Sequence, residues 1–375
     1  MNEAALILEG LDKIYNPGSA HPVQAVHGLK MQVAAGEIVA LLGASGCGKT
    51  STLRMIAGFE EVTAGQIRLK GREIHDLAPA RRNVAMAFEG YSLYPPLTVR
   101  ENIAFALKSA KLRREETTRR VEEIARLLEI EDILERYPSS ISGGQQQRAS
   151  LGRALVRDAD LHLLDEPMGQ LEPQLRALLR GRIKHHIKER GMTAILVTHD
   201  QTEANALADR IAVMEGGLLQ QFATPAVLKD RPANLFTGTF IGEPPMNVFV
   251  AKVGGGNGRL RLRLGEGAEL NYAAAAFEES VHARLLEHGQ IAIGVRPHAV
   301  RLVAEGVPAT VTVNQWLGDQ SHIAAEFAGG VLVAVEHRRA TVRPGERVAV
   351  ALAPEDLHFF DAGNGAAVSH GGRLA

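Results

Sequence analysis

The sequence has a single cysteine, Cys47, among 375 residues, which excludes a disulfide bond within the chain. It also lacks any apolar stretch near the roughly 20 residues that a membrane-spanning helix needs. Its first residues, MNEAALILEG, have neither the basic start nor the long apolar run of a secretion signal. We therefore expect a protein of the reducing cytosol, which reaches a membrane only through a partner.

An excess of charge of either sign is missing as well. The 42 lysines and arginines nearly balance the 43 aspartates and glutamates, which leaves a formal net charge of −1. A broad basic surface is therefore excluded, so we expect no nucleic-acid partner, and any anion site must be local. Hydrophobic residues make up 45% of the chain, which is enough for the cores of two or three domains.

Short apolar runs alternate with helical patterns in the N-terminal part of the chain. EIVALL, DLHLLDEP and MTAILVTHD are typical of buried strands, and the helical pattern KTSTLRMIA ends at Gly58. This alternation predicts an α/β domain over residues 1–240, with a parallel sheet and a site at the carboxyl ends of its strands. Residues from about 90 to 155 have mostly helical patterns and are expected to form a subdomain.

The pattern changes after Pro245. RLRLRL, ATVTV, GVLVAVEH and RVAVAL are short β-rich runs between glycine and proline turns. They predict a second, all-β domain over residues 241–375. The small and polar last stretch of that domain, AGNGAAVSHGGRLA, is expected to fray.

The strongest local signal is GASGCGKT, residues 43–50, which follows a predicted strand and precedes a predicted helix. It fits the pattern G-x-x-x-x-G-K-[ST] of a loop whose backbone N–H groups surround the phosphates of a nucleotide such as ATP. We expect Lys49 to neutralise the β- and γ-phosphates and Thr50 to bind Mg²⁺. The expected nucleotide-binding residues of this loop are Gly43, Ser45, Gly46, Cys47, Gly48, Lys49, Thr50 and Ser51.

Polar residues follow the next two predicted strands. Asp165 ends LHLLD and suits coordination of Mg²⁺, and the adjacent Glu166 is placed to polarise an attacking water. His199 follows LVT, where its side chain can reach a γ-phosphate. Acids at strand ends also cap helices, but beside a phosphate-binding loop the pattern favours a catalytic role for Glu166 and His199.

The stretch ISGGQQQR, residues 141–148, combines a serine, two glycines and three glutamines between two helical patterns. Its glycines permit another group to approach the backbone closely. The helix that follows offers free N–H groups to an anion. The residues alone do not say which anion this is, or on which molecule it lies.

Four motifs occur in order, and together they resemble the nucleotide-binding subunit of ABC transporters over nearly the whole chain: GASGCGKT, ISGGQQQR, LHLLDEP and VTHD. Four longer segments are similar to the ATPases of bacterial carbohydrate importers of the maltose and glycerol-phosphate type: FEGYSLYPPLTVRENIAFAL, HDQTEANALADRIAVM, FIGEPPMNVF and GVRPHAVRL. The resemblance implies an ABC cassette with a RecA-like core and a helical subdomain. An all-β, oligonucleotide-binding-like domain of the TOBE or MOP type would follow it and serve regulation.

The resemblance also implies partners. Two ATPase domains would pair head to tail around two ATP molecules, and Ser142, Gly143, Gly144 and Gln145 would touch the γ-phosphate held by the other subunit. Tyr15 would stack on adenine, although packing within a turn is the alternative for a tyrosine before Asn-Pro-Gly. Two transmembrane permease subunits would dock near Leu93–Pro96, at the cytoplasmic face of the bacterial inner membrane, and an extracytoplasmic solute-binding protein would act through them.

Two departures from the family pattern lie where ATP would be held between the two ATPase domains. The family has a glutamine that contacts Mg²⁺ where this chain has Glu89, which we expect to serve as a further Mg²⁺ ligand. The alternative is that the Glu89 side chain turns outward, away from the metal. The family reads Ser-Asn-Leu-Asp after the catalytic glutamate, whereas this chain reads Gly169-Gln170-Leu171-Glu172. These changes predict pairing with a second, different ATPase subunit more than pairing with an identical chain.

The resulting hypothesis is an ATPase that powers import of a sugar, a polyol or a glycerol phosphate. The alternative from another class is a regulatory subunit that binds ATP and hydrolyses little of it. A soluble ABC ATPase of translation or DNA repair is disfavoured, because the chain has one cassette and no basic stripe. The sequence does not identify the solute, which the membrane and binding-protein partners would select.

Overall fold

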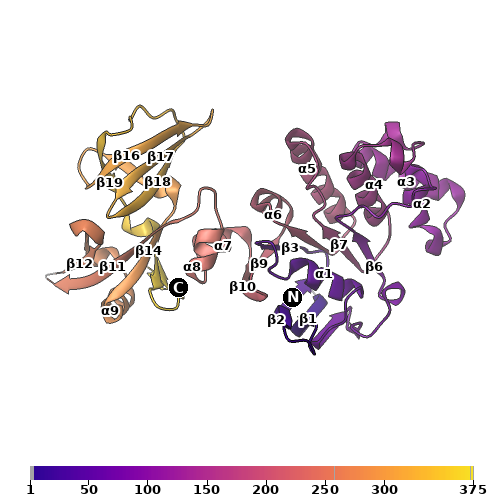
Figure 1. Cartoon of the computed structure of the whole chain (residues 1–375), viewed down its shortest axis with the longest axis horizontal. Helices are drawn as coiled ribbons and strands as arrows, with labels where there is room; N and C mark the ends of the chain where they lie inside the picture. The colour runs from indigo at the N-terminus through magenta and orange to yellow at the C-terminus, as the bar shows by residue number, and fades with distance from the viewer. Residues whose placement is uncertain (1–3, 257, 372, 375) are drawn as a thin grey trace. The chain divides into compact units, whose positions relative to one another are not determined.

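The chain divides into two units, residues 1–225 and 226–375, in a computed structural model that describes residues 4–256, 258–371 and 373–374 (Figure 1). The first unit contains a six-stranded sheet with the order β10-β9-β3-β8-β7-β6. Its strands are β3 (Ile38–Gly43), β6 (Val84–Ala87), β7 (Leu161–Asp165), β8 (Ala194–Thr198), β9 (Arg210–Glu215) and β10 (Leu218–Ala223). All pairs are parallel except β9 with β10.

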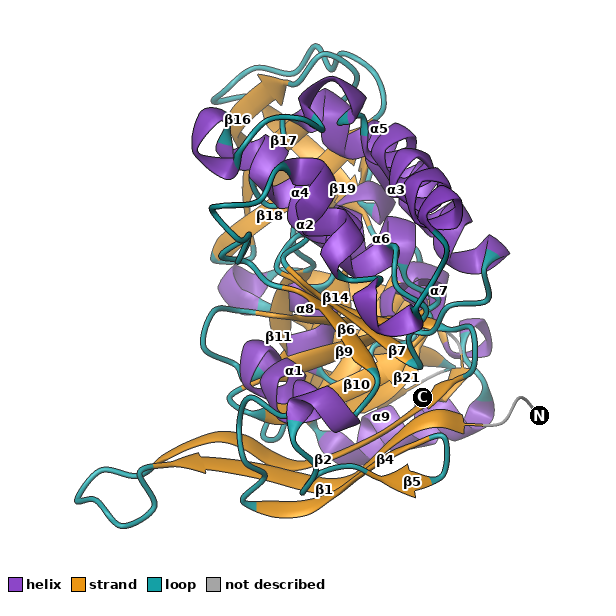
Figure 2. Ribbon diagram, turned by 90° about the vertical axis from the view of Figure 1, so that its right-hand side faces the viewer, coloured by secondary structure: helices purple, strands orange, loops and turns teal. Residues whose placement is uncertain are grey.

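A second sheet of the first unit is antiparallel, with the order β2-β1-β4-β5 (Figure 2). Its strands are β1 (Ala4–Tyr15), β2 (Val23–Ala34), β4 (Ala64–Leu69) and β5 (Arg72–Glu73). Helix α1 (Lys49–Ala57) packs between the two sheets, because Leu53 and Ile56 share one core with Val39 of β3 and Leu8 of β1. This core fixes the start of α1 against the carboxyl end of β3.

The other helices of the first unit are α2 (Val99–Phe105), α3 (Arg114–Leu128), α4 (Gly143–Leu155), α5 (Pro173–Glu189) and α6 (Gln201–Leu207). In α3 and the turn after it, Val121, Ile124, Leu128 and Ile130 are buried, while the charged side chains of the helix face solvent. Figure 1 shows α5 and α6 on the opposite side of the parallel sheet from α1. The expected helical segment, the parallel sheet and the helix that ends at Gly58 are confirmed.

The second unit consists of two antiparallel sheets with a shared core. Its first sheet has the order β13-β12-β11-β14-β20-β21-β22, and its second has the order β15-β19-β16-β17-β18. The strands are β11 (Asn247–Gly256), β12 (Arg259–Arg263), β13 (Glu269–Ala273), β14 (Gln290–Val295), β15 (Arg301–Val303), β16 (Val307–Trp316), β17 (Ser321–Phe327), β18 (Gly330–Glu336), β19 (Arg347–Ala351), β20 (Leu357–Asp361), β21 (Ala367–His370) and β22 (Arg373–Leu374). Helix α9 (Glu279–His288), which the sequence analysis did not predict, packs on this core through Val281 and Leu285.

The boundary between the units lies earlier than the boundary expected after residue 240. Two short helices, α7 (Pro225–Asp230) and α8 (Leu235–Phe240), lie at the start of the second unit. The buried guanidinium of Arg296 holds them there, since it donates hydrogen bonds to the carbonyls of Lys229 and Gly238, each at 2.8 Å. The two helices therefore pack with the β-rich domain, although their sequence continues the helical pattern of the first.

The expectation that the last stretch frays was wrong for the part that the structure describes. Residues 367–370 form β21, which pairs with β20, and residues 373–374 form β22; residues 372 and 375 lie outside the described residues. Val368 is buried in the shared core, and the Ala367 N–H donates to the Ala233 carbonyl at 3.0 Å. Pairing with a neighbouring strand therefore orders a stretch whose composition alone favours a coil.

Candidate functional site

The polar segments that the sequence analysis singled out follow adjacent strands of the parallel sheet. The phosphate-binding loop follows β3, Glu166 follows β7, and His199 follows β8. Glu89 lies two residues after β6. Because parallel strands present their carboxyl ends at one edge of the sheet, these segments share that edge.

The loop between β3 and α1 depends on glycines with left-handed backbone conformations. Gly46 has φ +80° and Gly48 has φ +97°, and a Cβ atom at Gly48 would lie 2.2 Å from the carbonyl oxygen of Ala25. No side chain caps the start of α1 at Gly48. The first N–H groups of the helix therefore remain available for an anion, as a phosphate site requires.

Lys49 is buried and its ammonium group points back into this loop. Its Nζ donates hydrogen bonds to the carbonyl oxygens of Gly43 at 2.7 Å and Ala44 at 2.9 Å. These bonds hold the ammonium group of Lys49 within the loop. A buried ammonium needs a negative partner, which the phosphates of a nucleotide bound to the loop would supply.

Cys47 is buried, and its Sγ lies 3.7 Å from the Nζ of Lys49. A Cβ atom added at Gly43 would lie 2.6 Å from this sulfur, so the thiol fills the space beneath the loop. The side chain faces the protein interior, and only the backbone of Cys47 is available to a phosphate.

Asp165 lies at the end of β7 and is only 4% exposed. Burial, together with the charges of Glu89 and Glu166, raises the pKa of its carboxyl group to about 6, against the opposing effects of the Arg54 charge and a hydrogen bond from Thr50. Its Oδ1 atom has no hydrogen-bond partner among the described residues. A buried carboxylate oxygen with no partner, beside a threonine hydroxyl, fits a hard divalent cation such as Mg²⁺.

Glu166 and His199 form a direct pair. The Nδ1 atom of His199 lies 3.0 Å from Oε1 of Glu166. Glu166 has a left-handed backbone with φ +46°, and its N–H donates to the carbonyl of Val197 at 3.0 Å. Such a conformation is rare for a residue other than glycine and persists where its surroundings hold it, commonly at functional sites.

These residues surround a pocket of about 430 Å³. It is lined by Ser45, Gly46, Lys49, Thr50, Glu89, Gln147, Glu166, Gly169, Gln170 and His199. The phosphate-binding loop, the carboxylate and histidine pair, and both segments that depart from the family pattern therefore meet in one place. The pocket joins a cationic group with two carboxylates, which is the composition expected where a metal and a phosphate bind together.

Other predicted site residues lie outside this lining. Ser142 caps the start of α4, where its hydroxyl accepts the N–H of Gln145 at 3.3 Å, and Gly143 and Gly144 form the first turn. The hydroxyl of Tyr15 lies 3.1 Å from that of Ser51, and the ammonium of Lys13 lies 4.7 Å from the centre of the Tyr15 ring. The start of α4 is thus absent from the pocket of its own chain.

Two buried residues at this edge were not predicted from the sequence. Gln147 joins α4 to the backbone around Glu166, and Glu203, which is 2% exposed, accepts a hydrogen bond from the hydroxyl of Thr198 at 2.8 Å. Helical spacing was the available signal for Gln147, because residues three and four positions after Gly144 and Gly143 lie on the same face. No comparable local signal marks Glu203.

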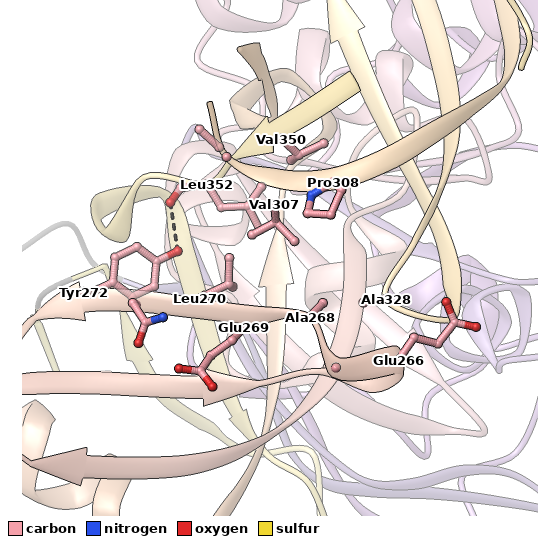
Figure 3. A pocket seen from close by; sticks show the side chains of 14 residues that line it. Glu266, Ala268, Glu269, Leu270, Tyr272, Val307, Pro308, Ala328, Val350 and Leu352 are labelled. Atoms are coloured by element: carbon pink, nitrogen blue, oxygen red, sulfur yellow. Dashed lines mark hydrogen bonds between the residues drawn. The ribbon is translucent and has the colours of Figure 1, made fainter. Parts of the chain in front are cut away.

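A second hollow, of about 570 Å³, lies in the second unit between the turn before β13 and the ends of β16 and β19 (Figure 3). Glu266 and Glu269 lie on its rim, and the hydroxyl of Tyr272 donates to the carbonyl of Leu352 at 2.8 Å. None of the 14 described residues that line it is Lys, Arg or His. Without a cationic side chain this hollow is a poor site for nucleotide phosphates.

Comparison with known proteins identifies two families in the chain. The ABC transporter family matches residues 26–169, and the TOBE domain family matches residues 293–360. The sn-glycerol-3-phosphate import ATP-binding protein UgpC of Cereibacter sphaeroides is 41% identical over 92% of this chain and 95% of its own length. The lactose transport ATP-binding protein LacK of Rhizobium radiobacter is 38% identical over 91% of this chain and 94% of its own.

Further relatives support the same assignment. The trehalose import ATP-binding protein SugC of Mycobacterium tuberculosis is 41% identical over 80% of this chain and 73% of its own length. The ATP-binding cassette MJ0796, solved as a dimer in a post-hydrolysis state with ADP and Pi, is 26% identical with a TM-score of 0.55, over 58% of this chain and 98% of that chain. The chain therefore belongs to the ATP-binding subunits of ABC transporters, in the group that contains the carbohydrate and glycerol-3-phosphate importers, and it is an ATP-binding, transport-coupled ATPase with a C-terminal TOBE domain.

Proposed function

We propose that this chain hydrolyses ATP in the 430 Å³ pocket, with Glu166 as the group that polarises the attacking water and His199 as the group that orients it toward the γ-phosphate. The observation that carries the proposal is the 3.0 Å contact between these two side chains in a pocket that Lys49 also lines. The carboxylate can accept a proton from water, and Lys49 offsets the charge of the phosphates. ATP hydrolysis by chains with Glu166→Gln or His199→Ala tests these roles.

The Mg²⁺ ion of the substrate complex would be held by Thr50, Asp165 and Glu89. When bound, the ion offsets phosphate charge and fixes the triphosphate. The Oδ1 atom of Asp165, which lacks a hydrogen-bond partner among the described residues, supports this choice of ligands. The charge of Glu89 raises the pKa of Asp165, which supports a place for Glu89 near the ion. Tyr15, whose hydroxyl forms a hydrogen bond with the hydroxyl of Ser51 beside the loop, would stack on adenine.

The functional unit would be a pair of ATPase subunits in which Ser142, Gly143, Gly144 and Gln145 contact the γ-phosphate on the partner. The absence of these residues from the pocket of their own chain supports this arrangement. Glu89 and the Gly169–Glu172 loop favour a second, different ATPase as the partner, because an added carboxylate near the γ-phosphate repels it. The two ATP sites would then be inequivalent.

Co-expression with a neighbouring ATPase gene tests the mixed pair. The expected product is a stable complex with one copy of each subunit. In that complex, Glu89→Gln changes the Mg²⁺ dependence of only the site built on this chain's phosphate-binding loop. A fully coupled transporter that contains two copies of this chain alone, and that is indifferent to Glu89→Gln, would contradict the proposal.

The membrane partner would dock in an apolar groove of about 780 Å³ in the first unit. The groove is lined in part by exposed aromatic rings, those of Phe59, Tyr94 and Phe105, and by Arg153 of α4. Tyr94 and Phe105 pack together with their ring centres 4.8 Å apart. Such a groove suits a short helix with an apolar face. Each of the two transmembrane permease subunits would supply one such helix to one ATPase subunit of the pair.

The chain would act at the cytoplasmic face of a bacterial inner membrane. Among the described residues, no helix is long and apolar enough to cross a membrane, so the permease subunits would hold it there. Sugars, polyols or glycerol phosphates are the proposed class of solute, which an extracytoplasmic binding protein would deliver. Transport assays in vesicles that contain the complete complex, with radiolabelled solutes of each class, test this assignment.

A further inference from the structure

A buried glutamine connects the helix that begins at Ser142 with the backbone around the catalytic carboxylate. Gln147 lies on α4 and is 4% exposed. Its Nε2 donates a hydrogen bond to the carbonyl oxygen of Glu166 at 2.8 Å, and its Oε1 accepts the N–H of Gln170 at 3.0 Å. Both ends of one amide are therefore occupied by the segment that follows β7.

These bonds fix the backbone of Glu166 from both sides. Its N–H is held by the carbonyl of Val197 on β8, and its carbonyl is held by Gln147 on α4. The residue between these bonds has φ +46°, a conformation that requires such support. A change in the position of α4 would therefore reach the Glu166 peptide through the Gln147 amide.

The loop after Glu166 also packs directly on the first turn of α4. A Cβ atom at Gly143 would lie 2.7 Å from Oε1 of Gln170, and a Cβ atom at Gly144 would lie 3.2 Å from the carbonyl oxygen of Gln170. The glycines of ISGGQQQR thus permit close approach of this chain's own loop. On the other side, the guanidinium of Arg176 donates to the carbonyl of Leu171 at 3.1 Å.

The same helix also holds the loop that follows Glu89. The guanidinium of Arg153, in the last turn of α4, donates to the carbonyl oxygen of Ser92 at 2.6 Å. Helix α4 therefore touches both loops that line the pocket opposite the phosphate-binding loop. Of its contacts, only the Gln147 amide reaches the backbone of Glu166 among the hydrogen bonds of the described residues.

We infer that Gln147 is a positioning residue, which couples the position of the Glu166 carboxylate to the position of the N-terminal turn of α4. This inference rests on the proposed function, in which that turn meets the partner's nucleotide and Glu166 acts on the chain's own. Movement of α4 on contact with the partner's phosphate is passed through the Gln147 amide to Glu166 and Gln170. In a pair, this chain's own ATP site is thereby linked to the ATP site on the partner through one side chain.

The test compares Gln147→Met with Gln146→Met in the full-length chain within its complete transporter. Gln146 is a matched control, because it is the adjacent glutamine of α4 and its Nε2 also donates to two backbone carbonyls, those of Pro138 and Ile141. Gln147→Met is expected to lower kcat for ATP about 10- to 100-fold and to change KM less than about threefold, since the phosphate-binding loop is untouched. Gln146→Met should keep kcat within about twofold of the parent.

A second variant separates positioning from simple packing. Gln147→Glu keeps the shape and the acceptor but loses the donor to the Glu166 carbonyl while it is ionised, and it regains an O–H donor when protonated. Because this position is buried, the pKa of the new carboxyl group is expected to lie above the ordinary glutamate value. Its kcat relative to the parent should therefore rise as the pH falls from about 8 to about 5.5. A ratio that stays flat with pH overturns the inference.

The remaining outcomes also decide. If Gln147→Met and Gln146→Met lower kcat equally, or if Gln147→Met raises KM as much as it lowers kcat, Gln147 has only a structural role and the inference fails. Failure of the proposed function is distinguishable, because it would appear in the parent chain as an absence of ATP hydrolysis, or in Glu166→Gln as a rate equal to the parent's.

Discussion

Glu203 shows how burial sets the properties of one residue behind the pocket. Burial, together with the charges of Asp200 and Glu166, raises the pKa of its carboxyl group to about 7, against the opposing effects of the hydrogen bond from Thr198 and the charge of Arg180. Its Oε1 has no hydrogen-bond partner among the described residues. The neutral acid is therefore the form that this site accommodates.

A raised pKa fixes the sign of the pH dependence. The contribution of Glu203 to stability is fully present below the ordinary glutamate pKa of 4.5 and is lost as the pH rises through about 7. The full effect is at most about 3 kcal/mol. Thermal unfolding of Glu203→Gln, without metal or nucleotide, should show a weaker loss of stability between about pH 5 and pH 8 than the parent chain shows.

The control for this prediction is Glu189→Gln, which removes a carboxylate that is 69% exposed on α5. Its stability should depend on pH as that of the parent does, because an exposed carboxylate is solvated in both the folded and the unfolded state. A Glu203→Gln profile that superimposes on those of the parent and of Glu189→Gln would show that the buried acid does not contribute.

The chemistry of single residues was partly readable from the sequence. Asp165 ends a short apolar strand, and Lys49, Glu166 and His199 come after such strands. This local pattern placed them at one sheet edge. Gln147 and Glu203 were missed, because their roles come from contacts with segments that the sequence does not bring near. The burial of Cys47 also depends on the packing around Gly43, which a motif does not encode.

At the scale of elements, the phosphate-binding loop offers a matched pair of glycines. Gly46 has φ +80° with nothing within 4 Å of an added Cβ atom, whereas a Cβ atom at Gly48 would clash with the Ala25 carbonyl oxygen at 2.2 Å. Gly46→Ala should cost about 1–2 kcal/mol of stability from its backbone conformation alone. Gly48→Ala should cost more and abolish ATP binding, because β2 must move away from the loop.

Chemical unfolding and binding of a fluorescent ATP analogue measure both effects. The comparison isolates the close approach of β2 from the left-handed conformation, which both positions share. Equal losses of stability and of ATP binding in the two variants would show that contact with Ala25 does not shape the loop.

Elements with a local pattern were predictable, and elements that depend on neighbours were not. Strands β3, β7 and β8 are short apolar runs with polar ends, so their sequence identifies them. Strand β21 is built from small and polar residues and is ordered by pairing with β20. Helix α9 lies between two β-rich stretches, and its two buried side chains gave too weak a periodic signal.

At the scale of the whole chain, the division into units predicts how it can be shortened. A chain that ends at Pro225 retains the phosphate-binding loop, α4 and His199, so it should fold and bind ATP. A chain that ends at Pro245 also keeps α7 and α8 but loses the Arg296 contacts that hold them. It should bind ATP as well but aggregate more readily, because α8 exposes apolar side chains.

Nucleotide binding and size-exclusion chromatography of the two shortened chains check this prediction. Loss of ATP binding in the chain that ends at Pro225 would show that the first unit does not fold independently. Equal solubility of the two chains would show that α7 and α8 do not need the second unit. The domain boundary expected from the sequence lay after residue 240, because the helical pattern continues to that residue. The contact that ties these helices to the second unit comes from Arg296, which lies more than fifty residues further along the chain.

The central claim is that ATP bound at the phosphate-binding loop is hydrolysed through the Glu166 carboxylate. The most direct test is to measure ATP binding and ATP hydrolysis by the complete transporter with Glu166→Gln, beside the parent. Glutamine keeps the size of the side chain and leaves Lys49, Thr50 and Asp165 in place, so ATP should bind with nearly unchanged affinity and hold the ATPase pair closed. Hydrolysis should fall by about two to four orders of magnitude. A hydrolysis rate equal to that of the parent would remove Glu166 from the mechanism and contradict the account.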